Sequence, residues 1–145
     1  MGSKKELSEL LAAVGIFSRC TNRQRRAIAR HCQIAEMPAG VTLIAEGEAG
    51  DALFVIVEGR AIITRDSVEL DRVGPGAYFG ELAILDGEPR SATVVAESDV
   101  KVAVIGIRMF RTLLREYSDL AEQLLIFLAG ELRAARNAAE RSPAS

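Results

Sequence analysis

The sequence is poor in the residues on which metal chemistry and nucleic-acid binding usually depend. It has one histidine, two cysteines, no tryptophan and a net charge of −2 in 145 residues. Iron and zinc centres of barrel enzymes usually need two or more histidines, and this chain has only His31. Cys20 and Cys32 are not spaced as a metal-binding pair, so the sequence predicts no metal site. A slightly acidic chain also lacks the positive surface that nucleic acid requires, so we expect no direct contact with nucleic acid.

Long hydrophobic runs are also absent. The longest apolar run covers residues 124–129 (LLIFLA), whereas a membrane helix needs about 20 consecutive apolar residues. The sequence therefore predicts no membrane contact by this chain and a cytoplasmic location, with which the low cysteine content agrees. The length predicts a single domain over residues 1–145.

Helical periodicity dominates the first 32 residues. Leu7, Leu10, Leu11 and Val14 form an apolar stripe that ends at Gly15, which predicts a short first helix. A capping-box pattern at Thr21 predicts a second helix that runs to about residue 31. This second helix is basic, and we interpret its arginines as a solvent-exposed face rather than a nucleic-acid patch, because no aromatic residues are interleaved with them. These arginines are Arg23, Arg25, Arg26 and Arg30.

The middle of the chain, at about 34–105, changes to short β-branched runs separated by turn residues. Asp66 and Ser67 lie between two such runs and predict the tip of a hairpin. Many short strands with glycine-rich turns indicate a sandwich or a jelly-roll barrel. Helical periodicity returns at about 107–140. A first helix there has one apolar face, formed by Ile107, Phe110, Leu113, Leu114 and Tyr117. A long final helix is expected from about Asp119 towards Glu140, in which Gly130 marks either a weak point or a close contact.

The segment 78–96 (YFGELAILDGEPRSATVVA) has the composition of a polar site. A very short helix that begins at about Glu81 would leave the amides of Leu82 and Ala83 unpaired, and such amides suit an anion. Glu81 itself would repel phosphate but could accept hydrogen bonds from sugar hydroxyls. The segment thus predicts a ligand that combines phosphate with ribose.

Arg90 supplies the charge expected of such a site. Its planar guanidinium matches phosphate oxygens, and Ser91 and Ala92 are small enough to let the backbone approach the same ligand. The alternative is that Arg90 only ties down a loop by pairing with a nearby carboxylate. The candidates for such a pair are Glu81, Asp86 and Glu88.

Two ordered motifs then resemble a known family. Residues 79–85 (FGELAIL) with 89–94 (PRSATV) resemble the phosphate-binding cassette of cyclic nucleotide-binding domains. Residues 43–59, which include Gly47, Gly50 and Gly59, resemble the first strand-turn-strand signature of that family. The family includes bacterial catabolite activators, regulatory subunits of cyclic-AMP-dependent protein kinase and the cytoplasmic ends of cyclic-nucleotide-gated channels.

The resemblance implies a fold and a set of roles. The implied fold is α+β: an eight-stranded antiparallel jelly-roll β-barrel with short N-terminal helices, a short phosphate-binding helix and C-terminal helices. Arg90 would bind an exocyclic oxygen of the cyclic phosphate, and Glu81 would accept the ribose 2′-hydroxyl. The remaining contacts to phosphate and ribose would come from Gly80, Leu82, Ala83, Ser91 and Ala92. The candidates for the wall and lid around the base are Ile63, Val73, Leu132, Arg133 and Arg136.

The implied function is regulation without catalysis. The ligand would be cAMP in preference to cGMP, no cofactor would be needed, and movement of the C-terminal helices would control an effector such as a channel or kinase. The effector could lie in the same chain or in another, and a homo-oligomer stays open. Two alternatives are a ligand-independent interaction scaffold with an inactive pocket and a truncated transcription regulator.

Overall fold

The N-terminal helices form where the apolar stripe and the capping box predict them. In this computed structural model, which describes residues 4–80 and 87–141, α1 (Lys4–Leu11) is followed by a 3₁₀ turn, η1 (Gly15–Phe17), and by α2 (Asn22–Arg30). The capping box of α2 is confirmed: Gln24 N donates to Thr21 Oγ1 at 3.1 Å, and Thr21 N donates to Gln24 Oε1 at 2.8 Å. Two donors at the start of α2 are thereby satisfied.

The described strands form two antiparallel four-stranded sheets. The first has the order β1 (Gln33–Met37), β8 (Val100–Gly106), β3 (Ala52–Glu58) and β6 (Tyr78–Phe79). The second has the order β2 (Thr42–Ile44), β7 (Thr93–Ala96), β4 (Ala61–Arg65) and β5 (Val68–Val73). The predicted jelly-roll class is confirmed, but the sheets are not closed into a barrel, because no strand pair joins one sheet to the other among the described residues.

The β4–β5 hairpin turns at the predicted position. Asp66 and Ser67 have φ of 51° and 66°, which is the left-handed conformation that a two-residue hairpin turn demands of both central residues. The hairpin carries Ile63 and Arg65 on β4, and both line the cavity described below.

The first sheet separates two hydrophobic clusters because alternate residues of β3 point to its opposite faces. Leu53 and Val55 pack against the helices, together with Phe17 and Phe110. Ile56 points to the other face and packs between the two sheets. One cluster therefore anchors the helices, and the other forms the interior of the sandwich.

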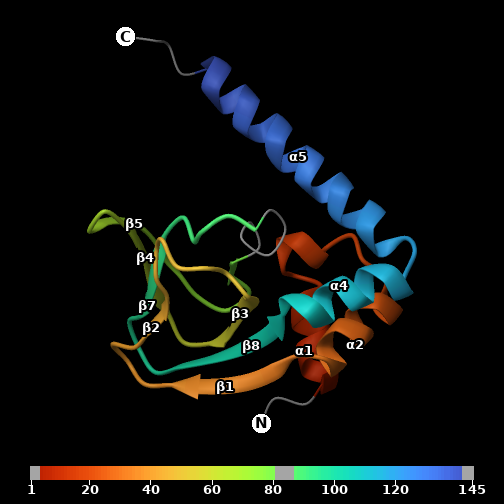
Figure 1. Cartoon of the computed structure of the whole chain (residues 1–145), viewed down its shortest axis with the longest axis horizontal. Helices are drawn as coiled ribbons and strands as arrows, with labels where there is room; N and C mark the ends of the chain where they lie inside the picture. The colour runs from red at the N-terminus through yellow and green to blue at the C-terminus, as the bar shows by residue number, and fades with distance from the viewer. Residues whose placement is uncertain (1–3, 81–86, 142–145) are drawn as a thin grey trace.

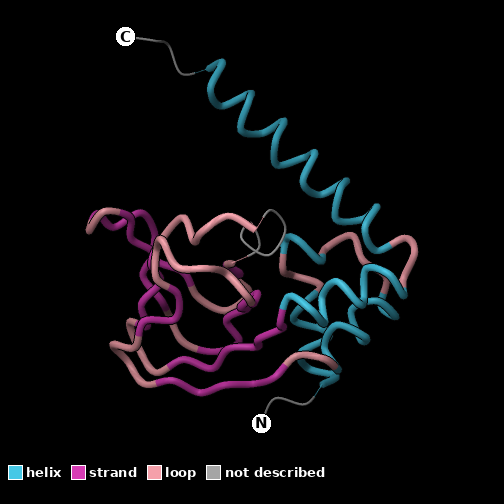
Figure 2. The backbone as a smooth tube through the Cα atoms, in the orientation of Figure 1, coloured by secondary structure: helices cyan, strands magenta, loops and turns pink. Residues whose placement is uncertain are grey.

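The C-terminal helices differ in how much of their surface they bury. The amphipathic helix α4 (Ile107–Glu116) packs through Phe110 and Leu113, whereas α5 (Leu120–Arg141) is buried only at Leu120 and Leu124. Figure 1 shows that the second half of α5 extends away from the two sheets, and Figure 2 shows the other helices gathered at one end of the molecule. In the described part of the chain, no helix combines the length and apolarity that crossing a bilayer demands.

The start of α5 is fixed to α2 by a buried side chain. Gln24, which is 2% exposed, donates from Nε2 to Asp119 Oδ1 at 2.6 Å. Further along α5, Phe127 packs near the ring of Tyr78, with ring centroids 6.5 Å apart. The first two turns of α5 are thus anchored, and its outer part is held by few contacts.

Gly130 lies in the outer part of α5, and substitution by alanine should stabilise the helix. A Cβ atom at this position would meet no atom within 4 Å, which excludes the close contact considered above. Alanine is favoured over glycine in a helix by about 1 kcal/mol, so we expect Gly130→Ala to raise helicity and to leave binding intact or improve it. Circular dichroism during thermal unfolding measures the effect; a loss of helicity would contradict it.

The two cysteines should be chemically inert in the folded protein. Burial raises the pKa of the Cys20 thiol to about 11. The smaller effect of the Arg25 charge lowers this pKa, and that of the Asp119 charge raises it. Burial likewise raises the pKa of the Cys32 thiol to about 11, and Lys4 opposes this. Because the thiolate is the reactive form, we expect almost no labelling by a chromogenic disulfide reagent at about pH 7.5. Labelling should become rapid in denaturant, and rapid labelling of the native chain would contradict the expectation.

Candidate ligand cavity

The two sequence motifs are brought side by side by backbone hydrogen bonds. Gly47 N donates to Arg90 O, and Arg90 N donates to Glu48 O, each at 2.8 Å. Glu46 N also donates to Thr93 Oγ1 at 3.0 Å. The loop between β2 and β3 is therefore a support for the loop that carries Arg90. This explains why the two motifs occur together in one sequence.

Arg90 is a buried cation at the edge of a cavity. The residue is 7% exposed, and its Nη2 donates to Ala52 O at 3.0 Å. Its guanidinium carbon lies 5.9 Å from the centroid of the Phe54 ring. A buried guanidinium keeps its charge and is costly to desolvate, so an anion at this cavity gains a strong and well-oriented partner.

Gly80 is required for the position of Arg90. Its φ is +96°, and a Cβ atom there would lie 2.3 Å from Arg90 Nη1 and 2.7 Å from Ala52 O. Any side chain at this position would have to displace the guanidinium or the β3 backbone. The glycine that precedes the predicted phosphate-binding helix thus also makes room for the arginine.

The cavity beside Arg90 has a volume of about 320 Å³ and is charged on one part and apolar on another. Arg65 and Arg90 are its cations, and Glu88 is the single carboxylate among the described lining residues. Its other lining residues are Ile44, Ile63, Leu70, Tyr78, Phe79, Gly80, Pro89, Ser91, Ala92 and Val94. This composition suits a ligand that has both an anionic group and a flat apolar group.

The apolar wall is built by neighbouring strands of the second sheet. Val94 of β7 pairs with Ile44 of β2 on one side and with Ile63 of β4 on the other. These three side chains therefore form a row across the sheet. The register of the β4–β5 pairing shifts between Ile63 and Thr64, and Leu70 of β5 lies opposite this irregularity. Leu70 is 49% exposed and lines the cavity.

The structure brings together some of the predicted site residues. Gly80, Arg90, Ser91, Ala92 and Ile63 line the same cavity. Glu81, Leu82 and Ala83, with the predicted phosphate-binding helix, lie outside the described residues, so their roles stay predictions.

The other candidates for contacts to the base do not line the cavity. Val73 packs into the hydrophobic cluster between the sheets. Leu132, Arg133 and Arg136 lie on the exposed outer part of α5, and Leu132 is 53% exposed. A lid role for these three residues therefore requires α5 to move.

Sequence reasoning missed Arg65 on the cavity lining. Its Nε donates to Ser91 O at 2.8 Å, so it connects the β4–β5 hairpin to the loop of Arg90. The signal was present, because Arg65 is two residues after the predicted wall residue Ile63 and shares its face of the strand. Leu70 carried no such signal, because its orientation depends on the irregular register.

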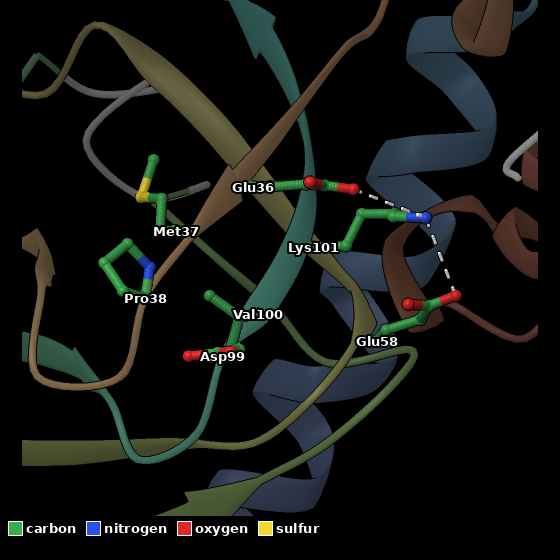
Figure 3. Close-up of a pocket in the computed structure, with 7 residues that line it drawn as sticks. All are labelled: Glu36, Met37, Pro38, Glu58, Asp99, Val100 and Lys101. Carbon is green, nitrogen blue, oxygen red and sulfur yellow. Dashed lines mark ion pairs between the residues drawn. The ribbon is translucent and has the colours of Figure 1, made fainter.

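A second pocket, shown in Figure 3, does not suit an anion. It lies at the ends of β1, β3 and β8 and is lined by Glu36, Glu58 and Asp99, with Lys101 as its one cation among the described residues. Lys101 Nζ lies 3.9 Å from Glu36 and 3.7 Å from Glu58, so its charge is already balanced. We interpret this pocket as a structural feature at the ends of three neighbouring strands of the first sheet.

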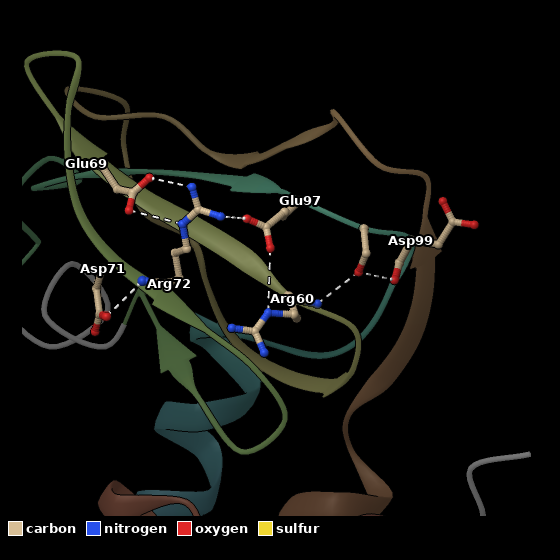
Figure 4. A network of polar contacts seen from close by, with 7 residues as sticks. Arg60, Glu69, Asp71, Arg72, Glu97 and Asp99 are labelled. Atoms are coloured by element: carbon tan, nitrogen blue, oxygen red, sulfur yellow. Dashed lines mark hydrogen bonds and ion pairs between the residues drawn. The ribbon is translucent and has the colours of Figure 1, made fainter.

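A network of ion pairs on the outside of the second sheet is also structural. Arg72 of β5 pairs with Glu69 at 3.1 Å and with Glu97 at 2.5 Å, and Arg60 lies 3.6 Å from Glu97 (Figure 4). These side chains are largely solvent-exposed, and exposed pairs add little stability. Their evident effect is to hold the β5 strand against the turn after β7.

The fold is an antiparallel β-roll with flanking helices, and in it a glycine makes room for a buried arginine at a half-apolar cavity. These features define a ligand-binding domain for an organic anion. Residues 34–117 match the family model described as the cyclic nucleotide-binding domain, and the chain belongs to this family. The matched region spans all the described strands except the first residue of β1, and it includes α4.

Three curated relatives show the range of proteins that contain such a domain. The chain is 40% identical to a cAMP-dependent protein kinase regulatory subunit of Aspergillus niger, over 76% of this chain and 27% of the relative. It is 32% identical to a CRP-like cAMP-activated global transcriptional regulator of Mycobacterium tuberculosis, over 90% of this chain and 61% of the relative. It is 38% identical to a cyclic nucleotide-gated potassium channel of Mesorhizobium japonicum, over 79% of this chain and 32% of the relative. The chain therefore matches between about a quarter and three fifths of the length of these relatives.

A solved structure agrees with the fold over nearly the whole chain. The N-terminal domain of a transcriptional regulator from Streptomyces coelicolor superposes with a TM-score of 0.81 at 30% identity, covering 89% of this chain and 96% of that one. The helices at both ends are thus part of the shared fold as well as the sheets.

Proposed function

We propose that this chain is a regulatory domain that binds cAMP in preference to cGMP and transmits binding to an effector through α5. The observation that carries the proposal is Arg90, a buried guanidinium at the edge of a cavity with one apolar wall. A cyclic phosphate would meet the guanidinium, and the purine would lie against Ile63 and its neighbours on the second sheet. No bond is made or broken in this function.

The preference for cAMP rests on the relatives rather than on a residue of this chain. The Aspergillus and Mycobacterium proteins are named as cAMP-dependent and cAMP-activated. Ser91 could contact either the phosphate or a guanine amino group, so its presence on the lining does not distinguish the two nucleotides.

The proposed output is a movement of α5 toward the cavity. The first turns of α5 are anchored by Gln24 and Phe127, whereas the outer part, with the lid candidates Leu132, Arg133 and Arg136, is exposed. A ligand shifts such a helix only if it binds one position more tightly than the other. Contacts between the base and the lid candidates would supply that difference.

Calorimetric titration of the chain, stripped of nucleotide by unfolding and refolding, tests the binding. We expect heat with cAMP, weaker binding of cGMP, and much weaker binding of 5′-AMP, which has the same base and sugar without the cyclic phosphate. Absence of heat with both cyclic nucleotides in a folded sample would favour the interaction scaffold instead.

The movement of α5 is tested by a distance measurement between two spin labels. Cysteines introduced by Ser67→Cys on the hairpin and Ala138→Cys on outer α5 can be labelled selectively, because Cys20 and Cys32 are buried. We expect saturating cAMP to shift the distance distribution to shorter values. An unchanged distribution, with binding confirmed by calorimetry, would refute the lid while leaving the nucleotide site intact.

The effector itself is proposed only by class. A channel, a kinase and a transcription regulator occur among the relatives, and this chain matches only part of each. The single-domain boundaries, the homo-oligomer and the cytoplasmic location likewise stay predictions.

A further inference from the structure

A groove between the two N-terminal helices is lined mainly by cationic side chains and is remote from the ligand cavity. It has a volume of about 690 Å³ and is lined from α1 and α2, which lie at the opposite end of the molecule from the β4–β5 hairpin (Figure 1). Five of its lining residues are cationic, and Glu9 is its one described carboxylate. We call it the basic groove; its lining residues are Lys4, Lys5, Ser8, Glu9, Ala12, Asn22, Arg25, Arg26 and Arg30.

This charge contrasts with that of the rest of the chain. Residues 4–32 contain seven Lys and Arg and two Glu, although the whole chain has a net charge of −2. The ion pairs of Arg60, Arg72 and Lys101 lie on the β-roll or its turns and leave the charge of these two helices unchanged. Like charges four residues apart on a helix, such as Arg26 and Arg30, destabilise it. The arrangement therefore carries a cost that a bound anionic group would offset.

The cations of the basic groove fall into two sets. Lys4 Nζ donates to Cys32 O at 2.5 Å, and Arg25 donates to Asn22 Oδ1 at 2.5 Å and to Cys20 O, so these two side chains are held by the protein. Lys5, Arg26 and Arg30 are exposed, and within the described ranges none of their side chains makes a hydrogen bond or ion pair. Three cations are thus available to a ligand in a groove that two others help to shape.

We propose that the basic groove binds an acidic segment of an effector protein. The helices have 8 and 9 residues, so the groove is roughly 12–14 Å long, which matches a short peptide segment. Ser8 and Asn22 can hydrogen-bond to a peptide backbone. The inference does not depend on nucleotide binding, because the two sites share no lining residue.

Nucleic acid fits the basic groove less well than an acidic peptide does. Its described lining contains no aromatic side chain on which a base could stack. Beyond residue 32 the chain is net negative, so a phosphate backbone that extends past the groove meets repulsion. Glu9 also disfavours a dense polyanion, whereas spaced carboxylates of a peptide can avoid it.

Fluorescence anisotropy with the full chain tests the basic groove. The probe is a fluorescein-labelled peptide of about twelve residues, alternating Glu and Ala, long enough to span the groove in helical or extended form. A peptide with Gln in place of Glu and a single-stranded oligonucleotide of equal charge are measured alongside it, at about 50 and about 150 mM salt. We expect binding of the Glu peptide that is stronger than that of both comparison probes and weakens with salt.

Two double variants, each of which removes two positive charges, show where the Glu peptide binds. Arg26→Gln/Arg30→Gln should weaken Glu-peptide binding at least tenfold, and Lys5→Ala should weaken it by a smaller factor. Arg108→Gln/Arg111→Gln, on exposed positions of α4, should leave it unchanged. Circular dichroism and cAMP titration of the same samples confirm the fold and keep the nucleotide site a separate question.

Three results would overturn the inference. They are no binding of the Glu peptide, equal loss in both double variants, and tighter binding of the oligonucleotide that depends on Arg26 and Arg30.

Discussion

Arg90→Ala is expected to weaken cyclic nucleotide binding by about 2 kcal/mol or more, which is about 30-fold in affinity. The guanidinium is the buried cation of the cavity, and it is held in place by Ala52 O. A charge-assisted contact to phosphate in a partly desolvated site is stronger than a neutral hydrogen bond, so its removal should dominate the energetics. Titration calorimetry of both proteins measures the loss.

Two controls separate charge from geometry. Arg90→Lys keeps a positive charge but loses the planar fork, so it should recover part of the affinity. Arg72→Ala removes an exposed arginine of the outer network and should leave affinity unchanged. The backbone of residue 90 remains able to make both of its loop hydrogen bonds in either substitution. Unchanged affinity of Arg90→Ala would remove the basis of the assignment.

Gly80→Ala is expected to reduce both stability and affinity. The alanine Cβ would lie 2.3 Å from Arg90 Nη1 at a φ of +96°, so the guanidinium must shift from its contact with Ala52 O. We expect affinity for cAMP to fall at least tenfold. The left-handed backbone adds a cost of about 1–2 kcal/mol to the free energy of folding.

Gly40→Ala is the matched control for this substitution. Gly40 has a φ of +92°, and a Cβ atom there would meet nothing within 4 Å. The backbone cost is therefore similar, without any effect on Arg90. We expect Gly40→Ala to lower the unfolding temperature and keep its affinity, and equal affinities of the two variants would show that the contact between Gly80 and Arg90 is unimportant for binding.

The fold could be predicted from sequence to the extent that local patterns determine it. The Thr21 capping box, the hairpin at Asp66 and Ser67, and the apolar face of α4 all form as predicted, because each depends on neighbouring residues. The closed barrel was wrong in detail, because closure depends on pairing between distant strands. Short strand patterns do not encode such pairing.

The candidate site could be predicted in part for a related reason. Gly80, Arg90, Ser91 and Ala92 were predicted from the cassette motif and Ile63 from the family resemblance, and all five line one cavity. Leu70 was missed because its orientation follows from an irregular register. Val73 packs in the cluster between the sheets, and its contact with the base stays a prediction. Arg26 and Arg30 of the basic groove were interpreted as part of a solvent-exposed face, since their convergence with α1 appears only in three dimensions.

The most direct test of the central claim is a crystal structure of the chain grown with saturating cAMP. We expect the cyclic phosphate to lie within hydrogen-bonding distance of the Arg90 guanidinium, with the purine against the wall that contains Ile63. A nucleotide bound elsewhere, or a phosphate that does not contact Arg90, would contradict it.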